Sequence, residues 1–400
     1  MKKLLLASVA SVASCVVAGA AFAESHVSEV KLGIIIGFTG PIESLTPSMA
    51  AASQAAIAEV NASGLFLGGS MVTGIEADST CVDAAAAQAA AERLVTSDGV
   101  KAIIGADCSG VTGAILTNVA IPNGIVMISP SATSPGLTTV EDAGLFFRTA
   151  PSDAREGEVA ADIMKERGIN SIAITYTNND YGKGLADAIQ TSFEAIGGTV
   201  TISAAHEDGK ADYSSEVAAL ASAGGDILVV AGYLDQGGLG IIKAALDTGA
   251  FDTFELPGGM IGDSLAPAVG DGLNGSFGQV PGTDAPGMGI LDGLSAGAFD
   301  VNSPYTPESY DAAALILLAM QAAGSAESAD FAGKVMDVAN APGTEIFPGE
   351  LAKGLQILLD GGDIDYVGAS AVELIGPGES AGNYREIDVV DGAITTTRFR

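Results

Sequence analysis

The amino-acid sequence predicts an α/β protein with two similar lobes, each containing a parallel sheet covered by helices. The first observation is a repeated alternation of short apolar runs with segments of helical periodicity. The second is that the apolar runs have no polar face, which is typical of parallel strands buried on both sides. The third is that the alternation restarts near residues 147–151, so that two α/β blocks follow one another along the chain.

The first block is predicted to alternate four strands with three helices. The segment Asp83–Ser97 reads DAAAAQAAAERLVTS, with Asp83 placed to cap a helix and Gly99 placed to end it. The expected strands are 30–36, 72–77, 100–104 and 124–129, and the expected helices are 47–61, 83–97 and 109–120.

The second block continues the same pattern and is followed by a less regular region. Its expected strands are 171–176, 199–203 and 227–231, and its expected helices are 153–167, 181–196, 213–223 and 238–248. Residues 258–289 are rich in Gly and Pro and have no long helical pattern. Thr306 and Pro307 then open another helix, a further helix spans about 328–340, and a strand-rich tail ends the chain.

Residues 1–23 are predicted to be a secretory signal peptide that is cleaved after Ala23. Two lysines precede an apolar run, which ends in the small-x-small site Ala21–Ala23. The stretch Val12–Cys15 resembles a lipoprotein cleavage box, so a lipidated Cys15 is the alternative. No other segment has 18 uninterrupted apolar residues, and the mature chain is therefore not expected to span a membrane.

The composition predicts a large core and a strongly acidic protein. The chain is 48% apolar and 16% charged, with a formal net charge of −32. This charge argues against nucleic-acid binding, which needs a basic patch, and disfavours docking on anionic lipid. Cys81 and Cys108 are expected to form a disulfide in an oxidising compartment, with free-thiol chemistry as the alternative. Two cysteines cannot make a four-ligand zinc site.

No motif in the sequence predicts catalysis, a cofactor or a metal. Residues 262–265 spell GDSL, the nucleophile block of one esterase family, but such an enzyme needs a downstream histidine as base. His26 and His206 both precede this block, so we interpret it as a chance match. The nucleotide-binding patterns GxGxxG and GxxxxGK[ST] are absent, and no His/Cys/Asp cluster has the spacing of metal ligands.

Small polar loops follow several predicted strands in both blocks. Ligands of open α/β sheets bind outside the carboxyl ends of the strands, and hydroxyl and N–H groups at a helix start suit a carboxylate. A plain turn or a helix cap is the alternative explanation for any single loop. The loops contain Thr39–Pro41, Ser109–Gly110, Ser129–Thr133, Asn178–Tyr181 and Tyr233.

Three stretches of the chain resemble type I periplasmic binding proteins of the leucine/isoleucine/valine-binding group, the solute receptors of ABC importers. They are DSTCVDAAAAQAAAERLVTSDGVKAIIGADCSG, GIVMISPSATSPGLT and SIAITYTNNDYGKGLADAIQTSFEAIGG. The resemblance implies two Rossmann-like lobes joined by three crossovers, with the ligand in a cleft that closes like a hinge. We expect lobe 1 to comprise 24–149 plus 277–365, and lobe 2 to comprise 150–276 plus 366–400.

The resemblance also implies roles for individual residues. Ser109, the serine after the second cysteine, is expected to bind the carboxylate of the ligand, and Ser131 and Thr133 are expected to add donors. Tyr181 and Tyr233 match aromatic positions on the second lobe.

The amine half of the site departs from the family pattern. Amino-acid receptors of this family often have an aromatic residue after the Gly-Pro turn. This chain instead has Ile42, Glu43, Ser44 and Leu45 there. The glutamate that grips the ligand amine aligns with Gly258 or Gly259. Either another acid substitutes or the ligand lacks a free amine. The substitutes considered are Asp235, Asp263 and Glu43, each of which is also explained as a solvated loop residue.

The predicted function is that of a periplasmic receptor that captures a small carboxylate-bearing solute, foremost a branched-chain or other amino acid, for an ABC importer. Its expected partners are this ligand and an ABC permease in the inner membrane, and the receptor is expected to be a monomer. Receptors for keto acids or aromatic carboxylates, and a signalling receptor with the same fold, are the alternatives. A secreted hydrolase is a further alternative, which the missing base disfavours.

Overall fold

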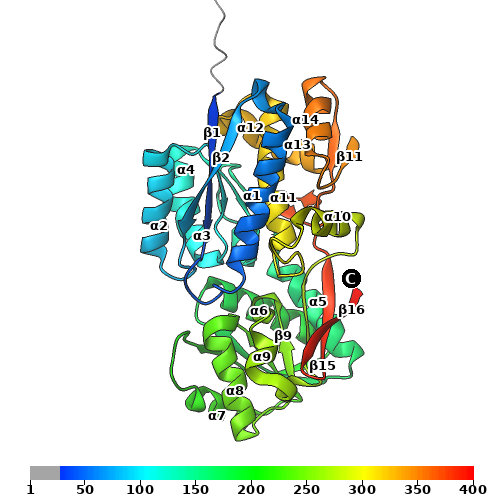
Figure 1. Cartoon of the computed structure of the whole chain (residues 1–400). Coiled ribbons are helices and arrows are strands. Elements are labelled where there is room, and N and C mark those ends of the chain that lie inside the picture. The colour runs from blue at the N-terminus through cyan, green and yellow to red at the C-terminus, as the bar shows by residue number, and fades with distance from the viewer. Residues whose placement is uncertain (1–27) are drawn as a thin grey trace, which may run out of the picture.

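The computed structural model describes residues 28–400, which form two α/β lobes (Figure 1). The expectations for cleavage after Ala23 and for lipidation of Cys15 lie outside the described residues. Each lobe contains a seven-stranded sheet. Helices cover the faces of both sheets, as the sequence predicts. A two-stranded parallel sheet is added to lobe 1, formed by β11 (Thr344–Ile346) and β12 (Ile364–Tyr366).

The sheet of lobe 1 has the order β13-β14-β5-β4-β3-β1-β2. Strands β1 to β5 pair in parallel, and β14 pairs in parallel with β5. The central strands β3 and β4 are fully buried, as expected for strands covered by helices on both faces. The strands are β1 (Glu29–Ile36), β2 (Met71–Asp78), β3 (Ala102–Gly105), β4 (Val126–Ser129), β5 (Phe146–Pro151), β13 (Leu374–Ile375) and β14 (Glu379–Ser380).

The sheet of lobe 2 has the order β16-β15-β10-β9-β8-β6-β7. Strand β15 is antiparallel to both β10 and β16, so the last two strands close one edge as a hairpin. The strands are β6 (Ser171–Thr177), β7 (Thr199–His206), β8 (Ile227–Ala231), β9 (Phe254–Leu256), β10 (Phe277–Pro281), β15 (Tyr384–Val390) and β16 (Ala393–Phe399).

The predicted helices are present, and their caps explain where they begin and end. Asp83 accepts hydrogen bonds from the N–H groups of Ala85 and Ala86, and Gly99 ends the following turn with a positive φ. The principal helices are α1 (Thr46–Ser63), α2 (Ala84–Arg93), α3 (Ser109–Ile115), α5 (Asp153–Glu166), α6 (Asp180–Ala195), α7 (Ser214–Ala223), α8 (Leu239–Thr248), α10 (Pro286–Ser295), α11 (Thr306–Ala323) and α14 (Leu351–Leu359).

Helix α11 is the central helix of lobe 1. Its residues from Thr306 to Gln321 are all buried, because helices and the sheet surround it. Among residues 28–400, no single helix is long and apolar enough to cross a membrane, and α11 passes that test only together with Ser328–Ala339, from which it is bent by 87°.

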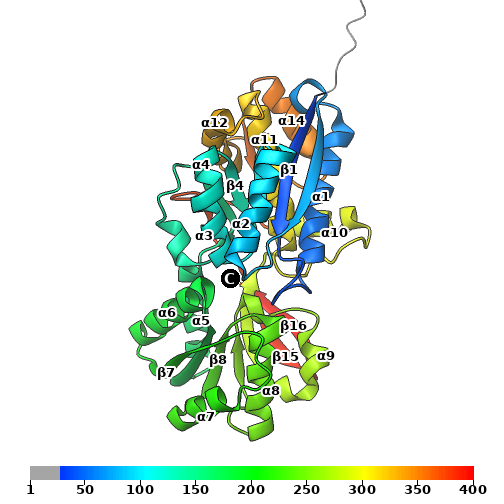
Figure 2. The same ribbon diagram turned by 90° about the vertical axis from the view of Figure 1, so that its left-hand side faces the viewer.

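The chain passes three times between the lobes, as the resemblance implies. The first crossing lies between β5 and α5, the second between β10 and α10, and the third between β14 and β15. Figure 2 shows α3 of lobe 1 facing α6 of lobe 2 where the lobes meet.

Two of the crossings differ from the expected boundaries at 277 and 366. Strand β10 belongs to the sheet of lobe 2, and β13 and β14 belong to the sheet of lobe 1. The chain leaves lobe 2 only after completing the buried strand Phe277–Pro281, beyond the Gly-rich stretch that guided the expectation. Strands β13 and β14 have two residues each, which is too short for a recognisable period of two.

Candidate ligand-binding site

The carboxyl ends of the central strands of lobe 1 are held together by Asp107. Its buried carboxylate accepts hydrogen bonds from the Gly37 N–H and the Ser79 hydroxyl, both at 2.7 Å. These partners follow β1 and β2, while Asp107 follows β3, so one side chain fixes three loops. Burial raises the pKa of Asp107, and these hydrogen bonds oppose that rise.

A small cavity lies between the lobes at this edge of the sheet. Its volume is about 20 Å³, which holds about one water molecule. A solute the size of an amino acid therefore requires the lobes to open or the lining side chains to move. The lining residues are Ile42, Leu45, Asp107, Cys108, Ser109 and Ser131, with Tyr181, Tyr233, Gly259 and Tyr305.

The predicted disulfide between Cys81 and Cys108 is confirmed, with the two Cα atoms 5.1 Å apart. It links the loop after β2 to the loop after β3, and Ser109 follows it as the first residue of α3. The cross-link therefore fixes the backbone that presents Ser109 to the cavity.

Ser109 is 3% exposed and lines the cavity. Its hydroxyl oxygen accepts a hydrogen bond from the Ser134 N–H at 3.1 Å, which leaves the hydroxyl proton for another acceptor. The first N–H groups of a helix have no partner within that helix, and Ser109 stands at the start of such a turn. Ser109 also lines a wider groove of about 500 Å³ between α3 and α6.

Ser131 and Thr133 lie on the loop after β4 but differ in their surroundings. Ser131 lines the cavity, and its hydroxyl donates to the carbonyl oxygen of Asp107 at 3.0 Å. Thr133 is buried outside the cavity lining, and its hydroxyl has no hydrogen-bond partner among residues 28–400. Its carbonyl oxygen accepts from the N–H of Asp153 at 2.8 Å.

Tyr181 and Tyr233 form the wall of the cavity on the side of lobe 2. Their rings stack with centroids 5.0 Å apart and planes inclined by 18°. Both are buried, and desolvation raises the pKa of each well above its usual value. The structure thus brings both tyrosines and Ser109 to one cavity, although they come from different lobes.

Tyrosine hydroxyl groups occupy the space beside Gly258 and Gly259. A Cβ atom on Gly258 would lie 2.7 Å from the hydroxyl of Tyr305, and one on Gly259 would lie 2.5 Å from that of Tyr181. A glutamate at either position would collide with them. Sequence reasoning missed Tyr305, which immediately precedes α11, because an isolated tyrosine before a helix carries no functional signal.

The three acids considered as amine partners do not line the cavity. Asp235 accepts hydrogen bonds from the N–H and hydroxyl of Ser44 across the interface between the lobes, at 3.0 and 2.6 Å. It also accepts from the Ser264 hydroxyl at 2.9 Å. Asp263 and Glu43 are exposed to solvent.

Four other acids, which sequence reasoning missed, are buried near the crossings. Asp153 and Glu156 begin α5, Glu255 lies on β9 and Glu308 begins α11, and each is at most 2% exposed. Desolvation raises the pKa of all four, to about 7 for Glu156 and to about 8 for Glu255 and Glu308. Asp153 and Glu156 come shortly after strand β5 in the sequence, and this position after a strand is the signal that could have pointed to them.

Residues 28–400 contain no group of three or more His, Cys, Asp or Glu side chains arranged to hold a metal ion. Glu156 is close enough to interact electrostatically with both Asp153 and Glu255.

A family model described as "Periplasmic binding protein" matches residues 29–350. The chain belongs to this family. The family comprises substrate-binding receptors rather than enzymes, and its members are periplasmic.

Two curated relatives cover most of the chain. A leucine-, isoleucine-, valine-, threonine- and alanine-binding protein of Pseudomonas aeruginosa is 27% identical over 319 residues, covering 79% of this chain and 84% of the relative. A Leu/Ile/Val-binding protein of Rhizobium johnstonii is 30% identical over 332 residues, covering 78% and 85%.

Solved structures share the bilobed fold. A leucine-binding protein of Thermotoga maritima superposes with a TM-score of 0.77 at 20% identity, covering 92% of this chain and 98% of the other. An ABC transporter solute-binding protein of R. palustris, in complex with 4-hydroxybenzoate, gives a TM-score of 0.73 at 20% identity, covering 93% and 97%. These structures confirm the predicted fold class.

Proposed function

We propose that this protein is the ligand-capturing receptor of an ABC importer and that it binds a small carboxylate-bearing solute, foremost an amino acid, in the cleft between its lobes. The named specificities of the two relatives support an aliphatic amino acid. The periplasm is the compartment in which such a receptor meets its solute before passing it to a membrane permease. A monomer suffices, because both walls of the cavity come from one chain.

The observation that carries this proposal is the environment of Ser109. Its hydroxyl proton is available, its oxygen is held by the Ser134 N–H, and it begins a helix whose first N–H groups lack helical partners. A carboxylate placed there gains hydrogen bonds and a favourable interaction with the helix dipole. Thr133, with its unpartnered hydroxyl, supplies a second donor once the cleft is occupied.

An aromatic carboxylate is the second candidate ligand. The stacked rings of Tyr181 and Tyr233 offer a flat surface against which another ring can pack. The neighbour from R. palustris holds 4-hydroxybenzoate on the same fold.

A binding comparison tests the carboxylate site. L-Leucine, 4-methyl-2-oxopentanoate and benzoate are titrated into the wild-type protein by calorimetry, after a thermal-shift screen in which a bound ligand raises the melting temperature. Since a hydrogen bond to a charged group contributes about 1.5–3 kcal/mol, Ser109→Ala is expected to weaken the best ligand roughly 10-fold or more.

Ser131→Ala is the matched control, because the Ser131 hydroxyl already donates to Asp107. We expect this variant to lose less affinity than Ser109→Ala. Unchanged affinity in a folded Ser109→Ala protein, or no binding of any of the three probes, would contradict the proposed function.

A further inference from the structure

A second pocket lies beside the points where the chain crosses between the lobes. Its volume is about 60 Å³, which holds a few water molecules or one small ion. Gly282 and Thr283 of the second crossing line it, as do Ser303 before α11 and Arg385 near the start of β15. We call it the crossing pocket, because segments of both lobes meet in it.

Arg385 is a charged side chain of this lining, and it has no ion-pair partner among residues 28–400. Its guanidinium donates to the carbonyl oxygen of Asn302 at 2.6 Å. Every other arginine in this part of the chain pairs with a carboxylate, namely Arg93, Arg148, Arg155, Arg167, Arg398 and Arg400. An unpaired guanidinium is therefore exceptional in this protein, whose formal net charge is −32.

The two acids that influence Arg385 do not neutralise it. Burial raises the pKa of Glu308 to about 8, so its carboxyl group is mostly protonated at neutral pH. Asp300 is exposed, and its carboxylate accepts the Asn302 N–H at 2.9 Å. Burial also lowers the pKa of Arg385, because the partly buried guanidinium has lost part of its hydration. An anion at contact distance would restore the interactions that the guanidinium has lost.

Gly282 brings the arginine close to the second crossing. A Cβ atom on Gly282 would lie 3.1 Å from both Cγ and Cδ of Arg385. The missing side chain lets the arginine stem lie against the crossing, and the guanidinium reaches Asn302, which also lines the pocket. Arg385 belongs to lobe 2, whereas Asn302 lies between α10 and α11 of lobe 1, so the unpaired cation stands where the two lobes meet.

Hydroxyl groups and apolar side chains complete the lining. Thr283, Ser303 and Thr396 each contribute a hydroxyl group that is able to donate a hydrogen bond. The Thr283 hydroxyl oxygen accepts from the Ala285 N–H at 3.1 Å, which leaves its proton for another acceptor. Met288 adds an apolar wall. A guanidinium, hydroxyl donors and an apolar wall together suit a small organic anion.

We propose that the crossing pocket is a second binding site, which holds a small carboxylate between the guanidinium of Arg385 and the hydroxyl groups of Thr283 and Ser303. A planar guanidinium matches a carboxylate with two parallel hydrogen bonds. The volume limits the ligand to the size of formate or acetate. The site is separate from the carboxylate site in the cleft, because Ser109 does not line the crossing pocket. Tyr305 lines both spaces and so forms the wall between them.

The acidity of the protein does not oppose binding at this pocket. Exposed charges are screened over about 8–10 Å at physiological ionic strength, whereas a guanidinium acts on a carboxylate at contact distance. The same acidity disfavours the loose accumulation of anions on the rest of the surface. A saturable effect of a small carboxylate on this protein therefore indicates a defined site.

Thermal unfolding with acetate as the probe tests the proposal. Melting temperatures are measured in HEPES buffer at one pH, with sodium acetate or with equal sodium gluconate, whose anion is too large for the pocket. We expect acetate to raise the melting temperature saturably, with half of the effect at a millimolar concentration. Arg385→Gln should weaken acetate roughly 10-fold or more. The matched control is Arg155→Gln, which removes an exposed arginine paired with Glu158 and should leave the effect unchanged.

Two further variants make the result decisive. Arg385→Lys keeps the charge but not the planar fork, so it should also bind acetate more weakly and serves if Arg385→Gln does not fold. Ser109→Ala alters only the site in the cleft and should keep the acetate effect. Equal melting temperatures of the wild type in acetate and gluconate, an acetate effect that survives at Arg385, or one that is lost in Ser109→Ala would overturn the second site. None of these outcomes depends on which solute binds in the cleft.

Discussion

At the scale of single residues, Glu255 shows how the folded protein accommodates a buried acid. Among residues 28–400, both of its oxygens and the carbonyl oxygen of Gln279 lack hydrogen-bond partners, although the two side chains are neighbours. A proton on Glu255 supplies the missing donor, and its pKa of about 8 keeps that proton bound at neutral pH. The folded protein therefore holds a proton that the unfolded chain, with an ordinary glutamate, releases.

This proton makes stability depend on pH in a definite direction. Burial raises the pKa of Glu156 to about 7 and of Glu308 to about 8, so these groups act in the same sense as Glu255. Since the native state binds more protons above the unfolded pKa, the free energy of unfolding should fall as pH rises from 6.5 to 8. His206 acts in the opposite sense, because burial lowers its pKa to about 4 in the folded protein while the unfolded histidine is still partly protonated near pH 6.5; it is one group against the three glutamates.

The expected result is a higher melting temperature at pH 6.5 than at pH 8 for the ligand-free protein. Glu255→Gln keeps the shape of the side chain without the ionisation, so it should reduce this difference and stabilise the protein at pH 8. Differential scanning calorimetry measures both values. A melting temperature that rises with pH, or an unaltered difference in the variant, would show that Glu255 is ionised at neutral pH.

The residues of the cavity could be predicted only where a local pattern marks them. Ser109, Tyr181 and Tyr233 each follow a predicted strand closely, where open α/β sheets bind ligands. Tyr305 reaches the cavity because the second crossing brings the start of α11 to it, which depends on how the lobes are joined. No spacing in the sequence reveals that arrangement, and so Asp153 reads simply as the first residue of a helix.

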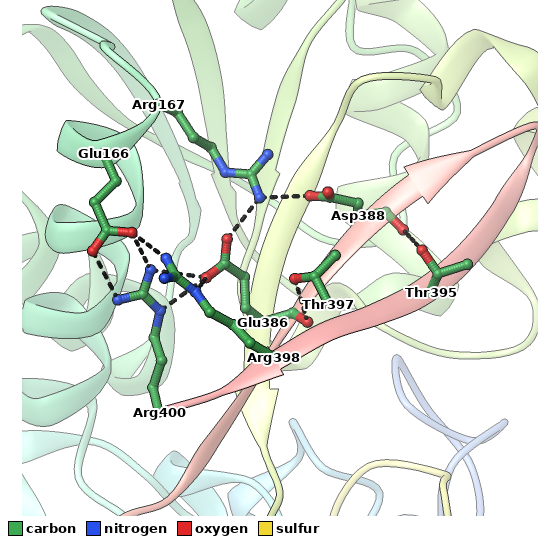
Figure 3. Close-up of polar contacts among 8 residues, drawn as sticks. All are labelled: Glu166, Arg167, Glu386, Asp388, Thr395, Thr397, Arg398 and Arg400. Atoms are coloured by element: carbon green, nitrogen blue, oxygen red, sulfur yellow. Dashed lines mark hydrogen bonds and ion pairs between the residues drawn. The ribbon is translucent and has the colours of Figure 1, made fainter.

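At the scale of elements, the C-terminal hairpin is fastened to lobe 2 by an ion-pair network (Figure 3). Glu386 on β15 is the centre: it accepts from Arg398 and Arg400 near the chain end and from Arg167 after α5, at 2.7 to 2.9 Å. The Glu386 side chain is only 5% exposed, so these pairs are less screened than typical surface pairs. The guanidinium of Arg167 also lies 4.3 Å from the ring centroid of Phe277 on β10.

Removing the central acid should loosen this hairpin. We expect Glu386→Gln to lower the free energy of unfolding by roughly 1–3 kcal/mol, between the values for surface and buried ion pairs, because the three arginines are partly exposed. Urea unfolding at low and high salt measures the effect, which should shrink with salt.

The matched control is Lys183→Ala, which breaks an exposed pair with Asp187 on α6. Exposed pairs contribute little, so this change should lower the free energy of unfolding by less than about 0.5 kcal/mol. Equal losses in the two variants would contradict a special role for Glu386.

The elements also show which parts of the fold could be predicted. The helices of both blocks were recognisable because their caps and periodicity are local, as at Asp83. The second and third crossings lie away from their expected positions at 277 and 366. The reason is that β10 merges into a Gly- and Pro-rich stretch and β14 has only two residues. Short strands are defined by the partners they pair with, and this information is absent from the local sequence.

At the scale of the whole molecule, contacts across the interface between the lobes hold the cleft closed over its small cavity. The Ser134 hydroxyl of lobe 1 donates to the carbonyl oxygen of Asp180 in lobe 2 at 3.1 Å. In a second contact between the lobes, Asp235 of lobe 2 accepts two hydrogen bonds from Ser44 of lobe 1. The Asp235 N–H also donates to the carbonyl oxygen of Pro41 at 3.0 Å. Because the cavity admits about one water molecule, a ligand must first meet an open form.

Asp235 is therefore expected to influence binding through closure, although it does not line the cavity. Asp235→Ala removes the side-chain bonds to Ser44 of the other lobe and should destabilise the closed form by about 1 kcal/mol, the usual contribution of a partly exposed hydrogen bond. Ligand that binds the closed form then loses about 5-fold in apparent affinity, since fewer molecules are competent. Small-angle scattering should show a larger radius of gyration for the ligand-free variant, and calorimetry should show the weaker binding. The control is Asp263→Ala, which removes an exposed neighbouring acid and should change neither the radius of gyration nor the affinity. A compact Asp235→Ala protein with wild-type affinity would mean that the other contacts alone keep the lobes together.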